Sequence, residues 1–169
     1  MQDFVHLHVH TQYSLLDGQA SVSRLVDKAM KDGMKGIAVT DHGNMFGIKE
    51  FTNYVNKKNS GPKGEIKDLK KRIAGIESGE IECEDKEAEI ADCRAKMAEA
   101  ESKLFKPIVG CEMYVARRTM DKKEGKPDQS GYHLIVLAKN EKGYHNLIKL
   151  VSHAWTRGYY MRCLLYTSP

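Results

Sequence analysis

The sequence lacks the features of a membrane-spanning, exported or disulfide-bonded protein. No hydrophobic run approaches the ~20 residues of a membrane-spanning helix, and the N-terminus has no basic and apolar signal-peptide pattern. The four cysteines form no CxxC pair, which argues against a zinc ribbon and a disulfide framework; they are Cys83, Cys93, Cys111 and Cys163. These absences predict a cytoplasmic protein in a reducing compartment.

The composition is that of a globular domain. The 169 residues are 41% hydrophobic and 30% charged, with a net charge of +4, and this length suffices for one ordinary domain. Residues 65–105 carry 12 acidic and 8 basic side chains, whereas the remainder carries 11 acidic and 19 basic ones. The positive charge therefore belongs to the chain outside 65–105.

Histidine is concentrated near the N-terminus. Three of the seven histidines, His6, His8 and His10, alternate with apolar residues, and Asp17 follows just before a glycine. On a β-strand alternate side chains share a face, so the imidazoles are expected to project together. Imidazole is a common zinc ligand and carboxylate is a hard oxygen ligand. The pattern favours a metal site, with a histidine-rich edge strand as the alternative.

The first 58 residues have a strand–helix–strand–helix order typical of an α/β fold. Residues 4–10 and 36–40 are the predicted strands, and 21–32 and 48–58 the predicted helices, the first with Ser21 as its N-cap. Such folds place their chemistry at the C-terminal ends of strands.

The region that follows has a different character. Residues 61–64, Gly-Pro-Lys-Gly, are predicted to form a loop, and 65–105 an inserted helical arm. Apolar residues step by three and four, as in a coiled-coil seam; they are Ile66, Leu69, Ile73 and Ile76, then Ile90, Cys93, Met97, Ala100 and Leu104. Two antiparallel helices would bury both stripes. A solvated charged surface is the first interpretation of this arm, and binding of a protein partner is the alternative.

Polar residues accompany the predicted strands. Asp41 and His42 follow the strand 36–40, and Glu112 interrupts the apolar strand predicted over 106–116. A buried carboxylate without a partner is costly, so Glu112 indicates a metal or a basic neighbour.

The last part of the chain resumes the α/β pattern. A basic loop over 117–130, a strand over 133–138 and a helix over 143–156 are predicted. We expect the four strands of the chain to run parallel in one sheet.

Five passages together resemble the PHP (polymerase and histidinol phosphatase) family. They are 8–18 (HVHTQYSLLDG), 39–44 (VTDHGN), 106–112 (KPIVGCE), 133–140 (HLIVLAKN) and 143–147 (GYHNL). The SLLDG and LAKN segments resemble the polymerase branch, the N-terminal domain of bacterial DNA polymerase III alpha subunits. The resemblance covers 4–162 apart from the arm, which varies within that family.

The resemblance implies a set of metal ligands: His8, His10, Asp17, His42, Glu112 and His133. His6 and Asp41 are expected to support these ligands from outside the shell, and His145 and His153 to be structural. The implied cofactors are divalent metal ions, zinc first, with manganese or magnesium as alternatives. The implied fold is an irregular (β/α)7 barrel, here partial, with the helical arm inserted.

The implied activity is metal-assisted phosphodiester hydrolysis as a 3′–5′ exonuclease. DNA polymerase activity, primer-template DNA and other replicase subunits would belong to a longer parent protein, and the fragment alone is expected to be inactive. A small-molecule phosphatase and a non-catalytic, metal-stabilised interaction module are the alternatives.

The sequence departs from the family at its end. Residues 1–162 are taken as a partial PHP domain, whereas 163–169 do not follow the family pattern and are expected to be unrelated sequence. The family's remaining ligands, a cysteine and an Asp-x-His, would lie beyond 162. The barrel is accordingly expected to be incomplete.

Overall fold

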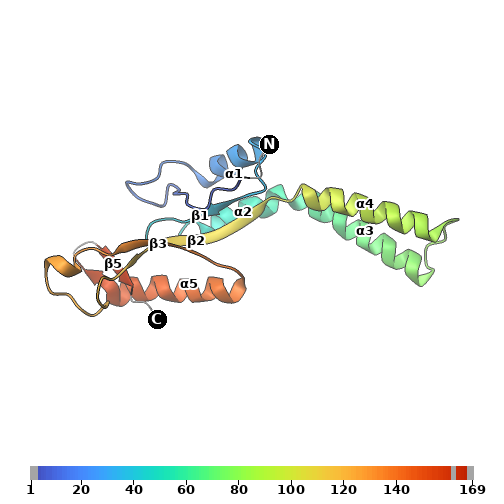
Figure 1. Ribbon diagram of the computed structural model, residues 1–169. Coiled ribbons are helices and arrows are strands. Elements are labelled where there is room, and N and C mark those ends of the chain that lie inside the picture. Colours follow the sequence, from blue (N-terminus) through green and yellow to red (C-terminus); the bar gives the residue numbers. More distant parts are fainter. Residues whose placement is uncertain (1–3, 161–162, 167–169) are drawn as a thin grey trace. The chain divides into compact units, whose positions relative to one another are not determined.

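The computed structural model describes residues 4–160 and 163–166 (Figure 1). Positions 161, 162 and 167–169, which include the end of the tail expected to be unrelated to the family, lie outside the described residues. The chain forms two compact units, one built from residues up to Thr52 and from Pro107 onward, the other from Asn53–Lys106. Across the described ranges, no helix is both long and apolar enough to cross a membrane.

The first unit contains a mixed sheet. Its path runs β1, β2, β5, β4, and β3 pairs with β2. The strands are β1 (Gly36–Val39), β2 (Lys106–Val115), β3 (Tyr132–Leu137), β4 (Tyr159–Tyr160) and β5 (Cys163–Tyr166). The α/β class is thus confirmed, while closure into a barrel stays a prediction.

The direction of β3 differs from the expectation. β3 runs antiparallel to β2, with Ile135 opposite Glu112 and His133 opposite Tyr114. The prediction that all strands are parallel is therefore wrong. A parallel return needs a crossover of a dozen or more residues, usually a helix. The connection between these strands contains the short 3₁₀-helix η1 (Lys126–Asp128) and no longer helix, so the chain turns back beside β2.

Residues 4–10 lie beside β1 without forming a regular strand. The N–H groups of Ala38 and Thr40 donate to the carbonyls of His6 and Val9, each at 2.9 Å. The N–H of Val9, however, donates to the hydroxyl of Thr40 at 2.9 Å. Because a side chain takes the place of a backbone acceptor, the ladder is interrupted. The prediction of a regular strand over 4–10 is therefore wrong.

The first two helices of the chain follow the predicted apolar stripes. α1 (Val22–Lys31) follows Ser21 and buries Val22, Val26 and Ala29. α2 (Ile48–Lys58) has the predicted bounds and buries Ile48, Phe51 and Val55.

The helix predicted over 143–156 is shifted towards the N-terminus. α5 (Glu141–His153) begins after Asn140, whose side chain accepts a hydrogen bond from the N–H of Gly143 at 2.9 Å. A one-turn π-helix, η2 (Ala154–Gly158), follows it. The core between α5 and β2 consists of Cys111, Met113, Leu147, Val151 and Ala154.

The second unit is a pair of packed helices, α3 (Ser60–Ser78) and α4 (Lys86–Ser102), joined by a short connection (Figure 1). The positions of the two predicted stripes are all buried or half-buried. Gly79, in the left-handed region at φ 81°, ends α3, and Asp85 caps α4 by accepting from the N–H of Ala88. Coiled-coil packing of this pair stays a prediction.

The predicted loop over 61–64 is wrong, because these residues form the first turn of α3. Pro62 is tolerated there, since N–H groups in a first turn have no acceptor within the helix. The side chain of Asn59, just before α3, bonds to the backbone of Phe105, which follows α4. It donates to the carbonyl of Phe105 at 2.8 Å and accepts from the N–H of Phe105 at 2.9 Å, with both residues buried.

Candidate metal centre

Six side chains from four separate segments meet at one place. They form three overlapping groups that could each hold an ion: His8, His10 and Glu112; His10, Asp17 and His42; and His42, Glu112 and His133. Within each group the candidate ligand atoms lie within 4.8 Å of one another. These are the six ligands that the family resemblance implies. The structure brings all of them together.

Glu112 on β2 is the centre of the cluster. It is 4% exposed, and its Oε2 lies 2.9 Å from Nε2 of His8 and 2.6 Å from Nε2 of His10. Its Oε1 lies 2.5 Å from Nδ1 of His133. Burial raises the pKa of Glu112, but hydrogen bonds from His8, His133 and His10 and the charge of His42 outweigh burial and lower that pKa to about 2. The carboxylate is therefore ionised at neutral pH and suited to a cation.

His42 links the second and third groups. Its Nδ1 lies 2.7 Å from Oδ2 of Asp17, and its ring stacks on Tyr114 with centroids 4.7 Å apart. Its Nε2 is buried and has no hydrogen-bond partner among the described residues. A buried polar atom without a partner is unfavourable, and a metal ion would satisfy it. The donor set of imidazoles and carboxylates fits a zinc-type ion or a similar divalent metal.

Asp41 holds the loop that carries Asp17. It is 1% exposed, and its oxygens accept from the N–H of Thr11 at 2.7 Å, the hydroxyl of Thr11 at 2.8 Å and the hydroxyl of Ser14 at 2.8 Å. Ser14 in turn accepts from the N–H of His42 at 2.9 Å. This loop also has to pass close to itself, since a Cβ on Gly18 would lie 2.2 Å from the carbonyl oxygen of Thr11.

The remaining histidines lie outside the three groups. His6 is exposed and its ring contacts that of Phe4 edge-on, at a centroid distance of 4.7 Å. His145 and His153 are exposed on α5. Cys111, which precedes Glu112, is buried, and burial raises the pKa of its thiol to about 12. The thiol points to the backbone, with Sγ 3.3 Å from the carbonyl oxygen of Asp41.

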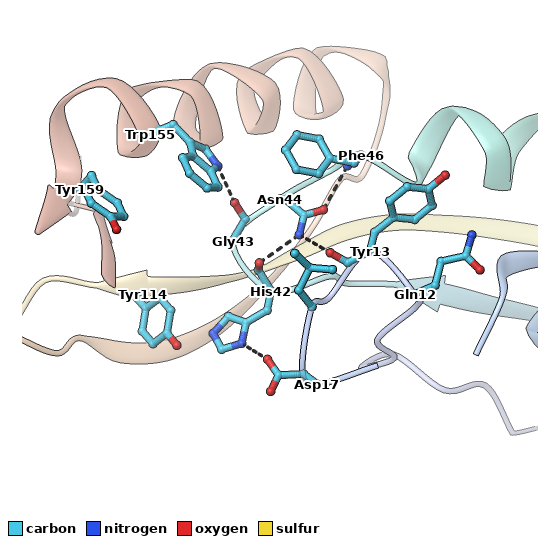
Figure 2. Close-up of a pocket in the computed structure, with 11 residues that line it drawn as sticks. Gln12, Tyr13, Asp17, His42, Gly43, Asn44, Phe46, Tyr114, Trp155 and Tyr159 are labelled. Atoms are coloured by element: carbon cyan, nitrogen blue, oxygen red, sulfur yellow. Dashed lines mark hydrogen bonds and ion pairs between the residues drawn. The ribbon is translucent and has the colours of Figure 1, made fainter. Parts of the chain in front are cut away.

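An aromatic pocket of about 460 Å³ adjoins the cluster (Figure 2). Asp17 and His42 line it together with Tyr114, Trp155 and further aromatic residues. The sequence reasoning did not find this pocket. Tyr114 follows Glu112 by two residues and so shares its strand face, a signal that was available. Trp155 is placed by the π-helix after α5, which the sequence pattern does not reveal.

Comparison with known proteins identifies a family and several relatives of this chain. The PHP domain family matches residues 6–167. The DNA polymerase III subunit alpha of Borreliella burgdorferi is 39% identical over 160 residues, and that of Treponema pallidum is 38% identical over 160 residues; each match covers 94% of this chain and 10% of the relative. The corresponding subunit of Aquifex aeolicus is 32% identical over 167 residues, covering 95% of this chain and 10% of the relative.

The chain therefore spans about a tenth of the length of these relatives. The region of similarity contains all six clustered ligand candidates. A family match over most of the sequence, supported by relatives at more than 30% identity, establishes family membership. The chain belongs to the PHP domain family.

Proposed function

We propose that the cluster binds two or three divalent metal ions and hydrolyses phosphodiester bonds. The observation that carries the proposal is the sharing of ligands, because His10, His42 and Glu112 each belong to two of the three groups. Shared ligands are suited to ions that lie close together, as in sites that clamp both the attacking and the leaving oxygen of a phosphate.

Bound ions would lower the pKa of a coordinated water to about 7 and neutralise charge on the phosphate. The chain's own residues prepare the site. The imidazoles offer ring nitrogens, Glu112 supplies a carboxylate that is ionised at neutral pH, and Asp41 fixes the loop that presents Asp17. The nitrogen-rich donor set favours zinc over magnesium, and manganese is the intermediate case.

The substrate is proposed to be DNA, hydrolysed from its 3′ end. The support is the similarity to DNA polymerase III alpha subunits, in which template-directed DNA synthesis, primer-template binding and contacts to other replicase subunits would depend on the remaining nine-tenths of the protein. In this proposal the 65–105 arm is a peripheral projection. Residues 163–167, which were expected to be unrelated to the family, fall within the family match.

Two other functions fit a metal cluster. A small-molecule phosphatase would need a pocket for a phosphate monoester, and an interaction module would hold metal without turnover. The aromatic pocket beside the cluster favours a substrate larger than a small phosphate monoester.

The double variant His8→Ala, His10→Ala of the full-length parent protein tests the proposal, since the fragment alone is expected to be inactive. Because the two imidazoles serve two of the three groups, we expect metal content, measured by mass spectrometry after dialysis, to fall by at least half. Hydrolysis of a 3′-labelled single strand should fall with it. The matched control is His145→Ala, His153→Ala, which removes two exposed imidazoles outside the cluster. Unchanged metal content in the first variant would refute the assignment.

A further inference from the structure

The aromatic pocket beside the candidate metal cluster is suited to binding a flat ring. Its walls include Tyr13, Phe46, Tyr114, Trp155 and Tyr159. Three of these rings are largely open to solvent: Phe46 is 68% exposed, Tyr159 54% and Trp155 48%. Ligand pockets typically measure about 300–1,000 Å³, and the volume of about 460 Å³ lies in that range.

The rings on this surface are held in place before any ligand binds. The indole N–H of Trp155 donates to the carbonyl of Gly43 at 2.9 Å, and the hydroxyl of Tyr13 donates to Glu50 at 2.8 Å. Tyr114 stacks on His42. Trp155 and Tyr159 are nearly parallel, with planes 8° apart. Fixed rings lose little conformational entropy when a ligand stacks on them.

The loop between the metal ligands and the aromatic rings is also braced. Asn44 donates to the carbonyls of Tyr13 and His42 at 3.0 and 3.1 Å, and accepts from the N–H of Phe46 at 3.2 Å. In Figure 2 these bonds tie the Phe46 and Tyr13 side of the pocket to the strand end that carries His42. The pocket and the metal cluster are therefore one connected structure, sharing Asp17 and His42.

We propose that this pocket binds a nucleobase of a single-stranded nucleic acid whose phosphodiester lies at the metal cluster. The inference rests on the proposed hydrolytic function, because it takes the phosphodiester position from the cluster. A nucleobase is the flat aromatic group that a phosphodiester substrate carries next to its phosphate. Stacking on aromatic side chains is sequence-tolerant, since every base has a π-face. The pocket would select nucleotide esters over small phosphate monoesters.

The chain carries its own reporter for this contact, because Trp155 is the only tryptophan in the sequence. A base that stacks on or beside the indole is expected to quench its fluorescence. The probes are a hexathymidylate and an abasic hexamer of equal charge, both with phosphorothioate linkages that slow hydrolysis. They are titrated into the metal-loaded full chain. We expect saturable quenching by the hexathymidylate and at least tenfold weaker binding of the abasic strand.

Phe46→Ala removes one exposed ring and leaves the reporter intact. Loss of one stacking partner should weaken hexathymidylate binding about 5- to 150-fold. Phe4→Ala is the matched control, since Phe4 is 57% exposed and lies outside the pocket, and it should bind as the wild type does. Melting curves of both variants check the fold.

The outcomes separate the two proposals. Equal binding of both strands, or unchanged binding by Phe46→Ala, overturns the nucleobase site even where the chain binds metal and hydrolyses DNA. Base-dependent quenching that Phe46→Ala weakens supports the site even where hydrolysis is absent, in which case the hydrolytic proposal alone fails.

Discussion

Replacement of Asp41 tests whether one buried carboxylate holds the loop that presents Asp17 to the cluster. The carboxylate accepts three hydrogen bonds, two at Oδ1 from the N–H of Thr11 and the hydroxyl of Ser14, and one at Oδ2 from the hydroxyl of Thr11. Asp41→Ala removes both acceptor oxygens, and with them all three bonds, at a position that is 1% exposed. Asp41→Asn keeps the shape of the side chain and the oxygen that accepts two of the bonds.

The magnitudes follow from the number of bonds lost. A hydrogen bond to a charged group contributes about 1.5–3 kcal/mol, so three bonds set an upper bound of about 5–9 kcal/mol. Relaxation of the loop and entry of water recover part of this, and we expect Asp41→Ala to lose about 4 kcal/mol of unfolding free energy. Asp41→Asn should lose about 1.5–3 kcal/mol, the contribution of one charged bond.

Urea denaturation of the full chain, followed by far-ultraviolet circular dichroism at neutral pH, measures both losses. Asp121→Ala is the matched control, because its side chain is 72% exposed, and it should change stability by less than about 0.5 kcal/mol. Equal losses for Asp41→Ala and Asp41→Asn would show that the three bonds do not hold the loop. A loss below about 1 kcal/mol for Asp41→Ala would refute the reasoning altogether.

Two further predictions concern other buried contacts. Asn59→Ala breaks both hydrogen bonds to Phe105 and should lower the unfolding free energy by about 2–4 kcal/mol, measured by urea denaturation; a comparable loss in the exposed control Asn53→Ala would contradict this. The hydrogen bond from Arg118 and that from the N–H of Glu124 lower the pKa of the buried Asp128 below its ordinary 3.8. A carboxyl group whose pKa is lower in the folded state stabilises the fold at pH values above its unfolded-state pKa. Asp128→Asn should therefore be less stable than the wild type at neutral pH. That difference should shrink as pH falls below 3.8; a difference that grows in acid would contradict the assignment.

The helices were largely predictable because their signals are local. The apolar stripes of α1 and α2 gave bounds within one residue of those observed, and the two stripes of the arm match the buried positions of α3 and α4. The error at 61–64 has a local cause as well. Glycine and proline indicate a loop in general, but a first helical turn accepts both.

The direction of β3 and the irregularity of residues 4–10 depend on long-range contacts. The hydroxyl of Thr40 replaces a backbone acceptor for Val9, and no pattern within 4–10 reveals a partner thirty residues away. The antiparallel return of β3 had a usable signal, the absence of helical periodicity between the strands. The order of strands and helices and the apolar runs of the strands predicted parallel strands instead.

The six ligand candidates came from the family resemblance, and the structure adds how far each side chain is buried. The three candidate ligands that belong to two groups are the least exposed, with side chains 18% exposed for His10 and His42 and 6% for Glu112. The ligands that belong to one group each are half-exposed: 52% for His8, 46% for Asp17 and 53% for His133.

This difference in burial bears on function because a metal site that only stabilises a fold is normally closed by its protein ligands, whereas a catalytic site keeps a side open to water and substrate. Here the buried ligands tie the groups together, and the exposed ones form the rim towards solvent. On that rim Asp17 lies where the cluster meets the aromatic pocket. A substrate held by its base in the pocket would thus reach bound metal ions past Asp17, one of the three half-exposed candidate ligands.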